Sequence, residues 1–460
     1  MSSNTLEAAD RRKRRIFVGA VTGHLIEWYD YGIYGFLAVT MGNLFFASDN
    51  PKVSLLSSFA AFALSFFVRP IGGLIFGPLG DRIGRKSTLT LVVSLMAGST
   101  LLIGLLPTYA TVGVLAPILL VLLRCIQGLS AGGEIGTVTA FVAESAGPHR
   151  RGLSTSWLMV TAVLGLLLGS FVANGFSVLL GEETMTAWGW RLPFLIAGPL
   201  GAIAAYIRLR LEDSPEFVAL ASSGHTEPTP LRTSLRWYRA LLLVFAIITV
   251  HASIFYLVLT YSSTFLTKEL GFDANVRFWY VIAAAALAAL VMPFGGLLSD
   301  TIGRRPFLLA SGVAATLSMA WFFFAAPGAT PTTFIFPMLA CALSFGLYAS
   351  STYATMTDLI PTRIRSTGIS LAYNLPVAVF GGCAPLIAAW LIATTGDITT
   401  PAWFFIATGV ISLIALVVLS PRDFARAAQE NERDQAKVLG TGAGSVAAEP
   451  ADATATTVSV

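Results

Sequence analysis

Gly77-Pro-Leu-Gly-Asp81-Arg-Ile-Gly84-Arg85-Lys86 is the stretch that decides the fold, because the chain contains it twice. The second copy, Gly296-Leu-Leu-Ser-Asp300-Thr-Ile-Gly303-Arg304-Arg305, keeps the spacing of aspartate, glycine and basic residues. Each copy follows the second of a series of long apolar runs. The repeat therefore predicts two similar halves joined in tandem.

The composition of the 460 residues indicates that most of the chain faces lipid. Hydrophobic residues make up 55% of it and charged residues only 12%, whereas about a quarter of the residues of an average soluble domain are charged. A helix needs about 20 apolar residues to cross a bilayer, and runs of this length fall into two groups of six. The predicted spans are 16–46, 54–79, 87–106, 113–145, 153–178 and 190–210, then 238–267, 277–298, 306–326, 333–357, 367–394 and 401–420. We therefore expect an all-α membrane protein with 12 transmembrane helices in two six-helix halves.

Lysine and arginine gather in alternate loops, and this bias predicts the orientation. The enriched loops carry Arg82, Arg85, Lys86, Arg150, Arg151, Arg232, Arg236, Arg304, Arg305, Arg363 and Arg365. Positive loops stay on the cytoplasmic side, so we expect a multi-pass protein of the cell (inner or plasma) membrane with both termini in the cytoplasm. We expect the first apolar run to be a membrane span rather than a cleaved leader. The predicted parts are a basic N-terminus (1–15), two six-helix bundles (16–211 and 238–420), a cytoplasmic linker (212–237) and a largely disordered tail (421–460).

The repeated loop and the six-plus-six arrangement resemble the major facilitator superfamily. Gly23-His-Leu-Ile-Glu27-Trp-Tyr-Asp30-Tyr-Gly-Ile-Tyr34-Gly, Arg69-Pro-Ile-Gly72 and the stretch from Arg124 to Glu134 resemble its metabolite:proton symporter family. This resemblance implies proton-coupled uptake of a small organic acid (a mono-, di- or tricarboxylate, or a shikimate-like or aromatic acid) or of a carboxylate-bearing zwitterion such as proline or betaine. Osmosensing members carry a long C-terminal coiled coil, and 422–440 shows no sustained heptads.

Glu27 and Asp30 are the candidate proton-coupling residues. They lie on one face of the first span, and Tyr31 and Tyr34 continue that face as candidate substrate contacts. A charge at the centre of a spanning helix costs about 2.5–3.5 kcal/mol, and two neighbouring buried carboxyls disfavour full ionisation of both. One of the two can therefore carry a proton, and the sequence does not separate them. The alternative is a permanently paired charge that holds two spans together.

Arg124 lies in the middle of the predicted span 113–145 and is the main candidate for substrate binding. Its planar guanidinium matches a carboxylate, which is either a carboxyl of the first span or the substrate itself. We expect the two to alternate, with a static ion pair as the alternative. Gln127, one turn further, can donate a hydrogen bond to the solute. Arg69 is a second mid-depth arginine, for which the sequence names no partner.

Polar residues of the second half are candidates for the opposite wall of the binding site, namely Tyr256, Tyr348 and Asn374. A further set is predicted to form charge pairs that break and form again as the halves move. Its members are Asp81, Arg82, Arg85, Glu134, Glu144, Arg151, Asp300, Arg304, Asp358 and Arg365.

Other classes of function lack their motifs in this sequence. No G-x-x-x-x-G-K-[ST] stretch is present, and the three cysteines show no paired spacing. We expect no enzyme activity, no cofactor and no metal, and partners limited to a small-molecule substrate, protons and the lipid bilayer, with no nucleic acid. We also expect a monomer. Two alternatives stay open, a proton-antiport exporter of amphiphilic compounds and a membrane sensor that transports nothing.

Overall fold

The computed structural model describes residues 3–46, 51–146, 148–210, 213, 215–222 and 226–438, and no strand occurs among them. The first half consists of α1 (Ser3–Phe45), α2 (Pro51–Ile83), α3 (Arg85–Leu105), α4 (Tyr109–Val112), α5 (Leu115–Ala146), η1 (Pro148–Arg150), α6 (Arg151–Thr184), η2 (Met185–Gly189) and α7 (Arg191–Leu209). Two short helices follow, α8 (Pro215–Ser222) and α9 (Pro230–Arg236).

The second half repeats this plan. It consists of α10 (Tyr238–Tyr256), η3 (Leu257–Tyr261), α11 (Ser262–Lys268), α12 (Ala274–Ile302), α13 (Arg304–Phe324), α14 (Pro331–Leu359), η4 (Thr362–Ile364), α15 (Arg365–Pro376), η5 (Val377–Gly382), α16 (Ala384–Thr395) and α17 (Pro401–Val418). Two predicted spans, 238–267 and 367–394, contain π-helical turns at η3 and η5. A last helix, α18 (Pro421–Val438), completes the described chain.

Eleven helical stretches in the described ranges are long and apolar enough to cross a membrane. The predicted first span lies in α1, whose hydropathy is lowered by polar residues such as His24, Glu27 and Asp30. These three side chains are buried within the protein, so they are shielded from lipid by neighbouring helices. The predicted fold class is confirmed.

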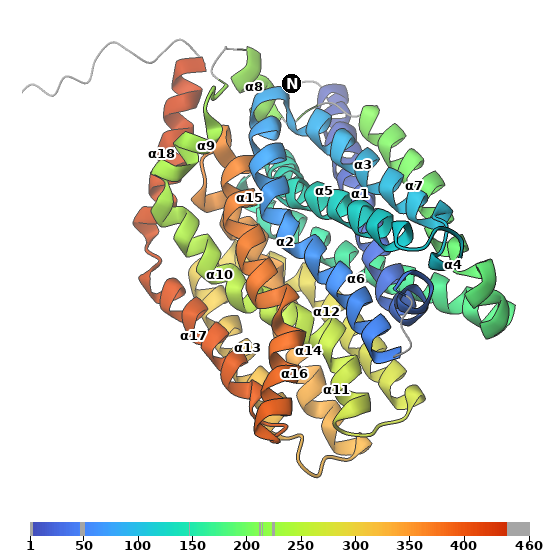
Figure 1. Ribbon diagram of the computed structural model, residues 1–460. Coiled ribbons are helices and arrows are strands. Elements are labelled where there is room, and N and C mark those ends of the chain that lie inside the picture. Colours follow the sequence, from blue (N-terminus) through green and yellow to red (C-terminus); the bar gives the residue numbers. More distant parts are fainter. Residues whose placement is uncertain are drawn as a thin grey trace, which may run out of the picture.

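The two halves meet along a small number of helices (Figure 1). On one side α2 and α5 pack against α15, and on the other α6 packs against α12 and α14. α8, α9 and α18 lie at the same end of the molecule as the start of α1. We call this the basic end, because the repeated Asp–Arg loops after α2 and α12 lie there.

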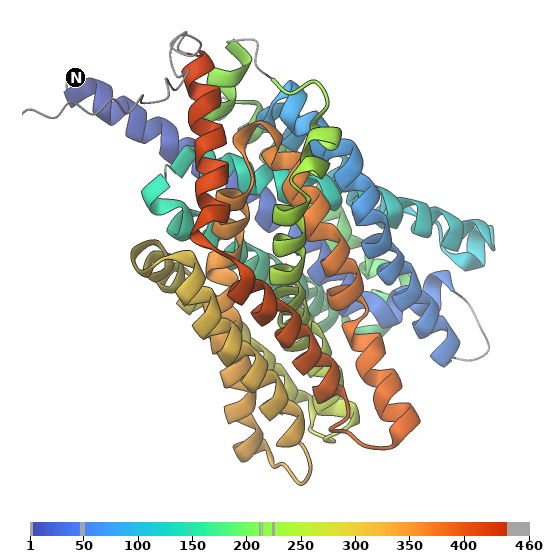
Figure 2. The ribbon, with the colours of Figure 1, turned by 90° about the vertical axis from the view of Figure 1, so that its left-hand side faces the viewer.

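Within the tail that the sequence predicts to be largely disordered, Pro421–Val438 form the helix α18 at the basic end (Figure 2). Arg363 of η4 pairs with Glu430 at 2.5 Å and with Asp434 at 3.7 Å. Arg239 Nε donates to Asp423 Oδ1 at 2.7 Å. Charge pairing with the loops of the basic end explains why a segment without heptads is an ordered helix. The predicted disorder of residues 439–460 lies outside the described residues.

Candidate functional site

Two buried ion pairs connect α1 to its neighbours in the first half. Glu27 lies 3.7 Å from Arg69 Nη2 of α2, and Asp30 accepts a hydrogen bond from Arg124 Nη1 of α5 at 3.2 Å. All four side chains are at least 96% buried. The carboxyls of the first span and the arginines predicted at mid-depth therefore lie together, and Arg69 gains the partner that the sequence did not name.

Glu134 extends this group toward the basic end. Its Oε1 accepts a hydrogen bond from Arg208 Nη2 at 3.0 Å, and its carboxyl also interacts electrostatically with Glu27. Arg208 was missed, because it stands at the end of an apolar run where a basic residue normally marks the membrane surface. Gly23 of α1 makes room for it, since a Cβ there would lie 2.1 Å from Arg208 Nη2. The signal in the sequence was Glu134, because a carboxylate inside a predicted span needs a buried positive partner.

Arg69 lies at the junction of the two halves. Its guanidinium carbon is 5.7 Å from the ring centre of Tyr31 and 5.5 Å from that of Phe66. Tyr256 and Tyr373 of the second half are close enough to interact with it electrostatically. Arg69 is 1% exposed, and its Nε and Nη1 have no hydrogen-bond partner among the described residues. Buried donors are normally paired, so Arg69 has two donors free for a bound anion.

Arg124 contacts Asp30 and Tyr34, which both belong to the first half. Its guanidinium carbon lies 3.6 Å from the ring centre of Tyr34, whose hydroxyl donates to Ser58 O at 3.1 Å. Gln127 Nε2 donates to Thr100 Oγ1 at 2.7 Å rather than toward the second half. This arrangement places Arg124, Tyr34 and Gln127 beside Asp30.

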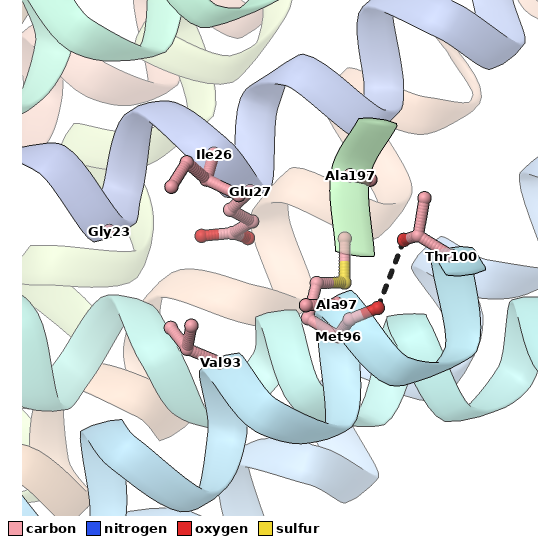
Figure 3. A pocket seen from close by; sticks show the side chains of 8 residues that line it. All are labelled: Gly23, Ile26, Glu27, Val93, Met96, Ala97, Thr100 and Ala197. Carbon is pink, nitrogen blue, oxygen red and sulfur yellow. Dashed lines mark hydrogen bonds between the residues drawn. The ribbon is translucent and has the colours of Figure 1, made fainter. Parts of the chain in front are cut away.

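A small cavity opens beside Glu27, between α1, α3 and α7 (Figure 3). Thr100, which bonds Met96 O at 2.9 Å, forms one of its walls. The cavity has room for about one water molecule. Glu27 therefore borders the candidate site on one side and a water-sized space on the other.

The predicted residues of the second half occupy different places. Tyr256 packs edge-on against Phe66, with ring centres 5.5 Å apart. Tyr348 lies within its own half, where its hydroxyl donates to Ile247 O at 2.9 Å. Asn374 Nδ2 donates to Gly132 O at 2.7 Å, which ties α15 to α5. Of the three, Tyr256 lies nearest to Arg69 and its aromatic neighbours.

Reciprocal helix caps join the halves at the basic end. Asp81 of α2 accepts hydrogen bonds from Ser366 N at 3.2 Å and Thr367 N at 2.8 Å, in the first turn of α15. Asp300 of α12 accepts from Gly152 N at 2.8 Å and Leu153 N at 2.9 Å, in the first turn of α6. A carboxylate stabilises the N-terminus of a helix by pairing with its free amides and its dipole. Each repeated motif thus caps a helix of the opposite half.

Ion pairs surround both caps. Glu144 lies 3.2 Å from Arg85 Nη2 and 3.0 Å from Arg365 Nη1, and these side chains are fully buried. Asp358, the matching residue of the second half, lies 3.0 Å from both Arg304 Nε and Arg151 Nη1. Its side chain is 21% exposed.

We call the eight residues of the two caps and their ion pairs the basic-end latch. They are Asp81, Arg85, Glu144, Arg151, Asp300, Arg304, Asp358 and Arg365. Two residues of the set predicted to form charge pairs lie outside this latch. Glu134 pairs with Arg208 of its own half, and Arg82 donates to Pro228 O ahead of α9.

Comparison with known proteins agrees with this architecture. The family model described as Major Facilitator Superfamily matches residues 20–375. The "Proline/betaine transporter" of Salmonella typhimurium is 35% identical over 88% of this chain and 83% of its own length. The "Glycine betaine/proline/ectoine/pipecolic acid transporter OusA" of Dickeya dadantii is 34% identical over 88% and 83%. A solved proton:xylose symporter, XylE, superimposes with a TM-score of 0.74 at 18% identity, over 90% of this chain and 96% of its own. The chain belongs to the major facilitator superfamily.

Proposed function

We propose that this protein is a secondary transporter that takes up a small carboxylate-bearing zwitterion, of the proline and betaine class, together with a proton. The observation that carries the proposal is Arg69, a buried arginine between the halves with two free donors and a weakly held carboxylate, Glu27, at 3.7 Å. The names of the relatives support the substrate class. They also favour transport over sensing without transport, and a zwitterion over an amphiphilic compound as the transported solute.

Exchange of partners at Arg69 explains how proton and substrate are coupled. A carboxylate of the substrate binds the guanidinium fork in place of Glu27. Glu27 then lies beside Glu134 without its counter-charge, a situation that favours binding of a proton. Protonation of Glu27 and binding of the substrate carboxylate together keep the number of buried negative charges unchanged, so each event lowers the free-energy cost of the other. In this scheme Asp30 and Arg124 remain an internal pair.

Alternating access places the basic-end latch on the cytoplasmic side, since positively charged loops remain inside. The two bundles, 16–211 and 238–420, then move about the linker 212–237. The protein lies in the cell (inner or plasma) membrane, and both termini face the cytoplasm. The closed latch leaves the opposite side as the side from which substrate enters. A single chain contains both walls of the site, so we propose a monomer.

Uptake by proteoliposomes under an imposed pH gradient tests this function. We expect accumulation of labelled betaine and proline when the interior is alkaline. Glu27→Gln should abolish gradient-driven accumulation while retaining exchange of substrate across the membrane. Asp30→Asn serves as the matched control and should keep its response to the gradient. Accumulation by Glu27→Gln at the level of the unmodified protein would refute the coupling scheme, and absence of uptake for all carboxylate zwitterions would refute the substrate class.

A further inference from the structure

Five aromatic side chains form a closed ring at the junction of the halves. Two come from α1, one from α2 and two from α10. They are Trp28, Tyr31, Phe66, Tyr256 and Phe255. Going round in this order, the centres of neighbouring rings are 5.4, 5.7, 5.5, 5.1 and 5.0 Å apart. We call this set the interface cage.

The ring planes turn at every step, as the panels of a cage do. Neighbouring planes meet at angles between 38° and 84°, so none of the five pairs is a parallel stack. Gly381 and Gly382 of η5 lie directly behind the cage. A Cβ on Gly381 would lie 2.7 Å from the ring of Tyr256, and one on Gly382 would lie 3.2 Å from Phe66. The backbone of η5 therefore approaches the cage as closely as only glycine permits.

Buried polar atoms distinguish the cage from ordinary packing. Trp28 Nε1, Tyr256 Oη and two nitrogens of Arg69 are buried and have no hydrogen-bond partner among the described residues. The three side chains are 4%, 5% and 1% exposed. A purely structural aromatic cluster would place such groups at the surface or pair them. The cage thus combines aromatic faces with free donors.

We propose that the interface cage binds the alkylated ammonium group of the substrate while Arg69 binds its carboxylate. A cation placed over aromatic faces is attracted by the ring quadrupoles, and this attraction strengthens when water is excluded. Arg69 lies over Tyr31 and Phe66, so we assign the ammonium group to the other three cage residues, Trp28, Phe255 and Tyr256. This inference rests on the proposed function and assigns the residues that select among carboxylate zwitterions.

The chemistry of the cage favours a fully alkylated nitrogen. A primary ammonium has three N–H donors, each of which loses a hydrogen bond to water on burial, and aromatic faces offer no full replacement for these bonds. A trimethylammonium group has no such donors. Because α10 belongs to the opposite half from α1 and α2, separation of the halves opens the cage and their closure surrounds the cation.

A methylation series tests the preference of the cage. Calorimetric titration of the purified full chain would compare glycine, N-methylglycine, N,N-dimethylglycine and betaine with 3,3-dimethylbutanoate, which has the shape of betaine without its positive charge. We expect affinity to rise along the series, and betaine to bind about tenfold or more tightly than 3,3-dimethylbutanoate, the isostere without the positive charge. Equal affinities of betaine and the isostere would overturn the proposal.

Substitution at Trp28 assigns the effect to the cage. Trp28→Leu should weaken the binding of betaine about tenfold and the binding of the isostere far less. The affinity of Trp28→Phe for betaine should lie between those of the unmodified protein and Trp28→Leu. Phe323→Leu is the matched control, because Phe323 is buried among the rings of Phe322, Phe265 and Phe405 in the second half, and it should change neither affinity. An equal loss for betaine and isostere in Trp28→Leu would contradict the assignment.

Tetramethylammonium separates this inference from the proposed function. It has no carboxylate and needs no proton, so its binding depends on the cage alone. If the protein accumulates no zwitterion but binds tetramethylammonium in a manner sensitive to Trp28→Leu, the proposed function fails and the cage stands. Uptake of betaine without binding of tetramethylammonium and without sensitivity to Trp28→Leu would overturn the cage and leave the function intact.

Discussion

Replacement of Asp300 by alanine should open the basic end of the protein. Asp300 accepts two backbone hydrogen bonds across the interface, from Gly152 N at 2.8 Å and from Leu153 N at 2.9 Å. Arg304 keeps Asp358 as a partner in the variant, so the change acts mainly on these two bonds. The variant therefore removes a cap between the halves without removing a residue of the central site.

The expected magnitude follows from the number and kind of bonds lost. A hydrogen bond to a charged group contributes about 1.5–3 kcal/mol, so two of them contribute roughly 3 kcal/mol at the lower limit. Since 1.4 kcal/mol corresponds to a factor of ten in an equilibrium constant, the ratio of closed to open molecules should fall about 100-fold.

Pulsed electron–electron double resonance measures the ratio of closed to open molecules directly. Spin labels at His149→Cys and Thr301→Cys, both exposed, report the separation of the halves in a chain whose three native cysteines are replaced. Asp300→Ala should shift the distance distribution toward longer values, whereas Asp397→Ala, between α16 and α17, should leave it unchanged. An unaltered distribution in Asp300→Ala would refute the view that the caps hold this end closed.

Three shorter predictions concern the central site, the interface and α18. Arg69→Lys should raise the apparent KM for uptake of betaine at least tenfold because a point charge replaces the fork, whereas Arg124→Lys should leave KM nearly unchanged; a larger effect of Arg124→Lys would move the anchor to α5. Gly136→Ala places a Cβ 2.4 Å from a backbone oxygen of α15, so it should lengthen the distance between the spin labels at residues 149 and 301. An unchanged distance would show that α15 shifts locally without separation of the halves. Hydrogen bonds from Arg239 hold the pKa of Asp423 below its usual range, so the contribution of this pair is complete at neutral pH and is lost as the pH falls below about 4; hydrogen exchange of 421–438 should rise there, and Asp423→Asn should lack this component.

The sequence was sufficient for the fold because its signals are local or repeated. Apolar runs of spanning length and the two Asp–Arg loops identify the helices. Glu144 and Asp358, both predicted to form charge pairs, lie in corresponding places of the latch. Partners across helices were harder to infer. The sequence left the partner of Arg69 unnamed because pairing depends on how helices rotate about their axes, which apolar periodicity determines only loosely in a bundle buried on several sides.

Two features lay beyond any local pattern. Arg208 stands where a snorkelling surface arginine is expected, and only the missing Cβ of Gly23 and the carboxylate of Glu134 turn it inward. The interface cage draws its members from three helices of both halves, so no spacing in one helix reveals it. Such sites arise from tertiary packing, which a single sequence records only indirectly.

The reciprocal placement of Asp81 and Asp300 has a consequence for how the polypeptide can be divided. Each bundle supplies the carboxylate that caps a helix of the other bundle. The two bundles therefore recognise each other through their folded surfaces and not through the segment that joins them. A gene split within 226–229, between α8 and α9, should therefore yield two fragments that reassemble when produced together. Either fragment made alone would present unsatisfied amides at one helix start, α6 in one case and α15 in the other.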